Sequence, residues 1–93
     1  MIDAKDLLLD PKGMLSKLCS RLGIAFEESM LTWEPGLRDT DGCWAEYWYG
    51  NALQSTGFAP WREKEAQVPA EYEELAVECE RLYEQLHAHR MTV

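Results

Sequence analysis

Residue types that commonly mark a particular chemistry are scarce in this sequence. The 93 residues include only three cysteines, Cys19, Cys43 and Cys79, and no two of them form the Cys-x-x-Cys spacing of zinc or redox sites. The two histidines, His87 and His89, lie two positions apart and would point to different sides of a helix. No glycine-rich phosphate-binding motif occurs. We therefore predict no metal, no cofactor and no catalytic residue in this chain.

Basic residues and long apolar runs are scarce as well. Nine lysines and arginines face 17 aspartates and glutamates, which gives a net charge of −8 and disfavours binding to a phosphate backbone. No apolar run approaches the roughly 18 residues of a membrane span, and the N-terminus carries Asp3 and Asp6 where a signal peptide needs basic residues. The sequence thus predicts a soluble, cytoplasmic protein that binds neither nucleic acid nor membranes.

The residues that are present predict an all-α fold of four or five helices in one compact domain, residues 1–93. Apolar residues at 46% and charged residues at 28% are typical of globular chains. Asp3 is a plausible cap for a short helix over residues 3–9. Asp10 and Pro11 should start a second helix that ends at Gly23, and residues 27–31 should form a turn. The second helix has an apolar stripe of Met14, Leu15, Leu18, Cys19 and Leu22.

The second half of the chain holds an aromatic segment and an amphipathic helix. The spacing of Trp44, Tyr47 and Trp48 favours a helix within residues 39–55, and we expect Trp44 and Trp48 to pack in the core. A final helix over about residues 69–89 carries an apolar seam of coiled-coil spacing. This seam could pack within its own domain, the interpretation favoured by its length, or pair with another helix. Its members are Tyr72, Leu75, Cys79, Leu82 and Leu86. Cys19 and Cys79 are expected to be core thiols.

Three short motifs resemble the C-terminal region of sulfotransferase-family proteins, which belong to the P-loop superfamily. They are DLLLDP at residues 6–11, a helix with L-x-x-L-C ending at Cys19, and LGIAF at residues 22–26. The similarity is best over residues 2–35. A subset of the family is similar to about residue 61, through DG-x-WA-x-YWY and STGF. The resemblance implies that this chain is the tail of such an enzyme.

In that family, an N-terminal phosphate loop and a central Arg and Ser pair bind the sulfate donor, phosphoadenosine phosphosulfate. No position of this sequence matches them, so the resemblance implies a chain that does not transfer sulfate by itself. In the parent fold, some apolar side chains of the first two helices would pack on a sheet. Leaving each one exposed costs roughly 1.5–3 kcal/mol. A second copy or a protein partner should therefore cover this candidate association surface, which consists of Leu7, Leu8, Met14 and Leu15.

Two other hypotheses remain open. The aromatic segment 44–61 could form a small-ligand site, with Trp33, Tyr47, Tyr49 and Trp61 on the ligand or partner surface, since Tyr and Trp are enriched at such sites. Alternatively, the chain could be the complementing half of a split sulfotransferase. The sequence does not fix the path of residues 56–68. Association, as a homo-oligomer or with a partner protein, is the leading hypothesis because it follows from the energetics of the uncovered apolar surface.

Overall fold

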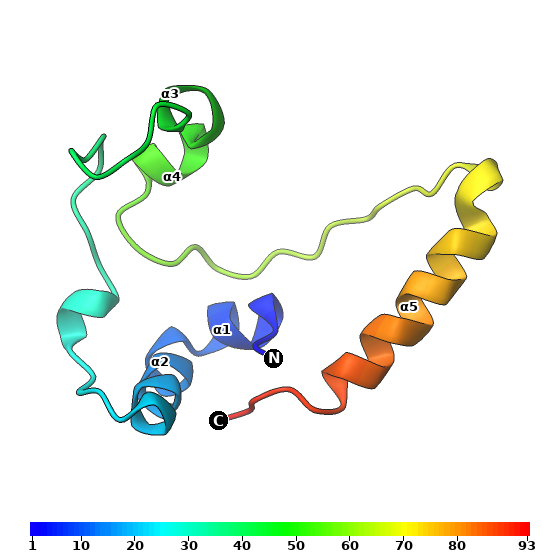
Figure 1. The fold of residues 1–93 in the computed structure, drawn as a ribbon, viewed down its shortest axis with the longest axis horizontal. Coiled ribbons are helices and arrows are strands. Elements are labelled where there is room, and N and C mark those ends of the chain that lie inside the picture. The colour runs from blue at the N-terminus through cyan, green and yellow to red at the C-terminus, as the bar shows by residue number, and fades with distance from the viewer.

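The computed structural model describes residues 1–93, which form helices joined by irregular chain (Figure 1). The only pairing of extended segments is an isolated antiparallel bridge between Thr32 and Gly57. The five α-helices are α1 (Ala4–Leu9), α2 (Pro11–Leu22), α3 (Ala45–Trp48), α4 (Gly50–Gln54) and α5 (Glu73–His87), and two 3-10 turns are η1 (Glu28–Met30) and η2 (Ala70–Tyr72). This confirms the all-α prediction. None of these helices is both long and apolar enough to cross a bilayer.

Local capping determines where α1 and α2 begin and end. The backbone N–H of Lys5 donates to Asp3 Oδ1 at 2.8 Å, and that of Gly13 donates to Asp10 Oδ1 at 2.9 Å. Pro11 occupies the first turn of α2, where its missing N–H costs nothing. Gly23 ends α2 in the left-handed conformation at φ 70°, which glycine adopts without steric penalty. The predicted boundaries of both helices, and the turn at η1, are confirmed.

The aromatic segment forms two short helices instead of one helix within residues 39–55. Tyr49, at φ −102° and ψ 21°, separates the four residues of α3 from the five of α4. A four-residue helix has too short an apolar face to pack on a neighbour, and only Ala45 is buried, at 1% exposure. Trp44 and Trp48 are 66% and 77% exposed, so their predicted place in the core is wrong.

The final helix is confirmed, but its predicted packing is not. Residues 70–72 form η2 and residues 73–87 form α5, inside the expected range of 69–89. No residue of α5 is buried, so the interpretation that its seam packs within its own domain is wrong. Cys79 is exposed, contrary to expectation, whereas Cys19 is buried as predicted.

The two ends of the chain meet beside α1 and α2, as Figure 1 shows. The backbone N–H of Met91 donates to the carbonyl of Met1 at 2.9 Å, and Lys17 Nζ donates to the carbonyl of Thr92. Met14 and Met91 are 1% and 4% exposed. A small core therefore lies where α1, α2 and the last residues come together.

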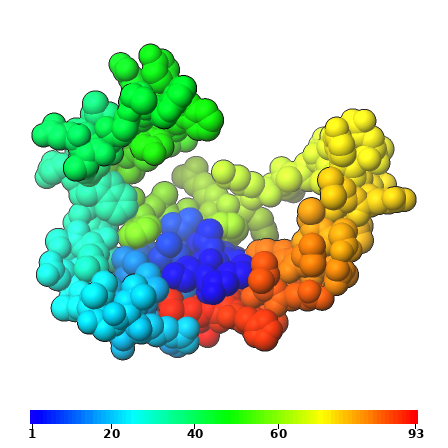
Figure 2. Space-filling view, in the orientation of Figure 1, coloured from blue at the N-terminus to red at the C-terminus, as the bar shows by residue number.

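The rest of the chain is open. Residues 58–69 have no regular structure and run from α4 to the start of α5 (Figure 1). The radius of gyration is 16.8 Å, against about 12 Å for a compact domain of this length. In Figure 2, open space separates the α3–α4 region from the first half of α5. The expectation of a compact unit is therefore wrong, and many large apolar side chains stay exposed.

Candidate functional site

Trp33 has a structural role in the fold. Its indole Nε1–H donates to Ser55 Oγ at 2.9 Å, and its ring meets the ring of Phe58 edge to face at 5.4 Å. The backbone N–H of Trp33 donates to the carbonyl of Thr56 at 3.0 Å. These contacts hold residues 55–58 against residues 32–33. The half-buried ring thus serves mainly to join two segments of the chain.

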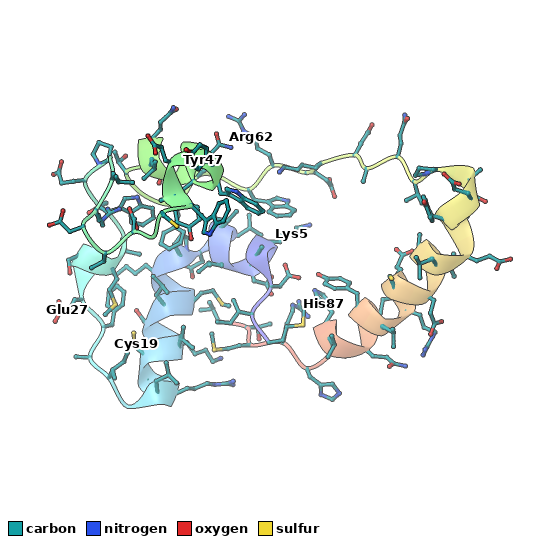
Figure 3. The ribbon with its side chains drawn as sticks, turned by 45° about the horizontal axis from the view of Figure 1, so that its top comes forward. Lys5, Cys19, Glu27, Tyr47, Arg62 and His87 are labelled. Carbon is teal, nitrogen blue, oxygen red and sulfur yellow. The ribbon has the colours of Figure 1, made fainter.

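Three aromatic residues on and beside α3 form an open patch. Trp44 and Trp48 lie edge to face at 6.4 Å, and with Tyr49 they line an open hollow of about 320 Å³. Among the predicted surface residues, Tyr49 belongs to this hollow. Tyr47 is 76% exposed (labelled in Figure 3), and Trp61 is half-buried on the connecting segment. Ligand sites usually combine apolar walls with a few placed polar or charged groups, and no charged side chain lines this hollow. The geometry therefore gives little support to the small-ligand hypothesis.

The predicted association surface on α1 and α2 is partly covered by the fold itself. Met14 is 1% exposed, and Leu7, Leu8 and Leu15 are half-buried. Only the edges of this surface are available to another molecule.

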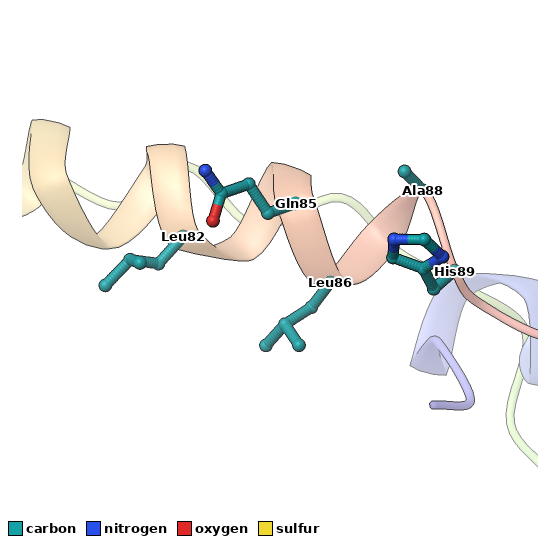
Figure 4. A pocket seen from close by; sticks show the side chains of 5 residues that line it. All are labelled: Leu82, Gln85, Leu86, Ala88 and His89. Atoms are coloured by element: carbon teal, nitrogen blue, oxygen red, sulfur yellow. The ribbon is translucent and has the colours of Figure 1, made fainter.

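An uncovered apolar seam runs from the end of η2 along α5. Tyr72 is 52% exposed, Leu75 61%, Leu82 46% and Leu86 60%. Leu82 and Leu86 project from the same side of the helix in Figure 4, where they line a shallow depression with Gln85, Ala88 and His89. Apolar side chains at coiled-coil spacing with no partner are typical of an interface. The sequence predicted the spacing of this seam. It could not predict that the seam is exposed, because a helix that packs inside its own domain has the same apolar spacing.

A polar cluster holds the end of α5 to the start of the chain. The Tyr83 hydroxyl donates to Asp3 Oδ2, and His87 Nε2 lies 3.9 Å from the same oxygen. Arg90 Nε donates to Asp6 Oδ2 at 2.6 Å. Sequence reasoning missed this cluster because its members lie some 80 positions apart, and no local pattern predicts such pairs.

The cluster shifts the proton affinities of two of its members. The hydrogen bond from Tyr83, together with that from the Lys5 amide, lowers the pKa of Asp3 below its ordinary value of 3.8. The same bond raises the pKa of Tyr83 above its ordinary value of 10.0. Both shifts favour the arrangement in which Asp3 is ionised and Tyr83 is protonated.

The remaining groups suggest no metal chemistry. No three His, Cys, Asp or Glu side chains gather as metal ligands would, and all three cysteines are free thiols. On α5, Glu78 forms an exposed ion pair with Arg81 at 2.7 Å, which lowers the pKa of Glu78. The structure thus offers two exposed apolar features, the seam along α5 and the aromatic patch around α3.

Comparison with known proteins identifies the family. Residues 1–89 match the sulfotransferase domain. Two proteins of Arabidopsis thaliana are similar over 89 residues, or 96% of this chain. Branched-chain-amino-acid aminotransferase-like protein 2 is 39% identical, and branched-chain-amino-acid aminotransferase-like protein 1 is 37% identical. The chain spans only 16% of the length of each relative. No solved structure matches. Because the domain match covers nearly the whole chain, the chain belongs to the sulfotransferase domain family.

Proposed function

We propose that this chain is a non-catalytic association module of a sulfotransferase-like protein, which acts by covering the seam of α5 with another polypeptide. The observation that carries this proposal is the exposure of that seam over the whole helix. Burying a large aliphatic or aromatic side chain gains roughly 1.5–3 kcal/mol, so several of them together are enough to drive association. The uncovered edges of Leu7, Leu8 and Leu15 add a smaller surface of the same kind.

The solution mass across a wide range of concentrations tests this function. We expect light scattering behind size exclusion to show a species heavier than the 10.7 kDa chain, in a proportion that rises with concentration. A constant monomer whose α5 amides are protected from hydrogen exchange would contradict the proposal, since the helix would then be covered from within. A monomer with unprotected α5 would instead indicate a different polypeptide as the partner.

A second candidate function is completion of a larger sulfotransferase-like domain. The observation that favours it is the length of the relatives, because this chain matches only 16% of each. In this case the parts that bind the sulfate donor would lie outside residues 1–93, and the helices would pack on a sheet supplied by them. Mixing the chain with a sheet-bearing fragment of a relative should then produce transfer of labelled sulfate, whereas neither piece should do so alone. No transfer from any such mixture would exclude this candidate.

A further inference from the structure

We propose that a hollow beside the meeting point of the two termini binds a medium-chain carboxylate, with the alkyl tail in the hollow and the carboxylate on Arg21. The hollow has a volume of about 440 Å³ and is lined by Met1, Ile2, Leu18, Arg21, Leu22 and Met91. This volume lies within the range of roughly 300–1,000 Å³ that is usual for small-ligand sites. The hollow is separate from the seam of α5, so it is present whether or not the chain associates.

The hollow lies in the part of the molecule where the two ends of the chain are held together (Figure 1). The backbone N–H of Met91 donates to the carbonyl of Met1 at 2.9 Å, and Lys17 Nζ donates to the carbonyl of Thr92. Met91 is 4% exposed and Leu18 is half-buried, so packing holds both side chains in place. The walls therefore exist before a ligand binds, which lowers the cost of ordering them.

The walls of the hollow suit an aliphatic tail. Five of the six lining residues are apolar, and Met1, Ile2 and Leu22 are 48%, 39% and 63% exposed. An alkyl chain laid against them removes part of this surface from water, which favours binding in proportion to the apolar area covered. None of the lining side chains is aromatic, so a flat ring would find no ring to stack on.

Arg21 supplies a free positive charge beside these apolar walls. It takes part in none of the four ion pairs of the fold, although the chain carries 17 acidic residues. Lys17 lies one turn earlier on the same side of α2, and no carboxylate lines the hollow. Asp3, which follows Ile2, already accepts the Lys5 amide and the Tyr83 hydroxyl. A carboxylate suits arginine because the planar guanidinium can donate two parallel hydrogen bonds to its two oxygens.

The net charge of the chain favours a single soluble ligand over a membrane surface. At −8, most of the chain would be repelled by a bilayer of anionic lipids. A single carboxylate responds mainly to the nearby Arg21 and Lys17. Because Arg21 is exposed, we expect weak, reversible and salt-sensitive binding.

Titration calorimetry with octanoate tests the ligand class. We expect saturable binding at one site that weakens as salt is added. Acetate has the carboxylate without the tail, 1-octanol has the tail without the charge, and octyltrimethylammonium has the tail with the opposite charge. Each should bind at least about five-fold more weakly than octanoate. Equal binding of octanoate and octyltrimethylammonium, or no binding of octanoate, would overturn the proposal.

Two matched pairs of variants test the assigned residues. Arg21→Gln should raise the octanoate dissociation constant about five-fold and reduce its salt dependence, whereas Arg62→Gln, which removes the same charge from the connecting segment, should leave both unchanged. Leu22→Ser should raise the constant about five- to ten-fold. Leu37→Ser is its control, since Leu22 and Leu37 are 63% and 66% exposed and only Leu22 lines the hollow. Equal effects within either pair would overturn the assignment.

The position of the bound ligand is measured independently of its affinity. Octanoate should shift the NMR signal of the Met91 methyl group and leave tryptophan fluorescence constant, because no tryptophan lines the hollow. A fluorescence change without a Met91 shift would place the ligand on the aromatic patch and overturn the proposal. Co-sedimentation of the chain with phosphatidylserine vesicles would indicate a membrane surface instead and would also overturn it. None of these outcomes changes the solution mass, which tests the association function separately.

Discussion

Asp3 connects the two ends of the chain. Its carboxylate caps α1 by accepting the Lys5 amide and also accepts the Tyr83 hydroxyl from the end of α5. The residue is 8% exposed, the one buried polar residue in the fold. Buried carboxylates need hydrogen-bond partners, and Asp3 has one in α1 and one in α5. The cap of α1 and the attachment of α5 therefore depend on the same side chain.

Tyr83→Phe tests this dependence. The substitution removes the hydroxyl donor to Asp3, so the pKa of Asp3 should rise toward 3.8, and the amides of residues 83–91 should exchange hydrogen faster. Carbon-detected NMR titration of the Asp3 carboxyl measures the first effect. Tyr72→Phe is the control, since Tyr72 is 52% exposed and its hydroxyl has no partner within the chain. An unchanged Asp3 pKa in Tyr83→Phe would show that the contact does not persist in solution.

The same pair predicts a pH range for the attachment of α5. The folded state lowers the pKa of Asp3, so this contribution is present above pH 3.8 and is lost as the pH falls below that value. The folded state raises the pKa of Tyr83, so its contribution is present below pH 10.0 and is lost above it. The chemical shift of the Met91 amide, which donates to the carbonyl of Met1, should therefore change as the pH falls below 3.8 and again as it rises above 10.0. An amide that shows neither change would contradict this.

At the scale of elements, the sequence predicts the helix boundaries that interactions between neighbouring residues determine. Asp3, Asp10 and Gly23 mark the ends of α1 and α2 because caps and a left-handed glycine act over a few residues. The spacing of the aromatic residues did not predict the break at Tyr49, or the exposure of Trp44 and Trp48. Helical spacing identifies one face of a helix, but it does not say whether another element covers that face.

Gly13 shows how a cap can reverse a propensity rule. Glycine inside a helix costs about 0.5–1 kcal/mol relative to alanine, which alone predicts that Gly13→Ala stabilises α2. A Cβ at this position would, however, collide with the Asp10 carboxylate that caps the helix. We expect Gly13→Ala to lower stability, since a lost cap costs about 0.5–2 kcal/mol.

The background variant Asp10→Ala makes this prediction specific. With the cap already absent, Gly13→Ala should stabilise the helix by about 0.5–1 kcal/mol. Urea unfolding followed by circular dichroism measures the free energy of unfolding of the natural chain, the two single variants and the double variant. If Gly13→Ala stabilises both backgrounds equally, the steric coupling between positions 10 and 13 does not exist.

At the scale of the whole molecule, the arrangement depends on few long-range contacts. Only five of the 93 residues are buried, and α5 is joined to the rest mainly through Tyr83, Arg90 and Met91. A sequence pattern gives no information about such contacts, because a pair such as Asp6 and Arg90 is 84 positions apart. The resemblance to sulfotransferases, in contrast, was readable from local motifs, and the domain match over residues 1–89 confirms the sulfotransferase-like family.

Limited trypsin digestion tests this open arrangement. Residues 58–68 make no backbone hydrogen bond, so a protease can bind them without unfolding a helix, and the first cuts should follow Arg62 or Lys64. Arg38 is the internal control, since its amide and guanidinium are both hydrogen-bonded within its loop. Mass spectrometry of early time points identifies the first site. A first cut after Arg38 or within α2 would show that the connecting segment is covered.

The cleaved chain then tests whether the contacts between the two termini hold the two pieces together. The C-terminal piece keeps its contacts to Met1, Asp3 and Asp6, so both pieces should elute together on size exclusion at neutral pH. Arg90→Ala removes the ion pair to Asp6, which is about three-quarters buried on both sides, and should let the C-terminal piece separate. If the two pieces of the cleaved Arg90→Ala chain elute together, Met91 and Tyr83 alone are enough to hold α5. If the two pieces of the cleaved natural chain separate, α5 is not fixed to the N-terminus.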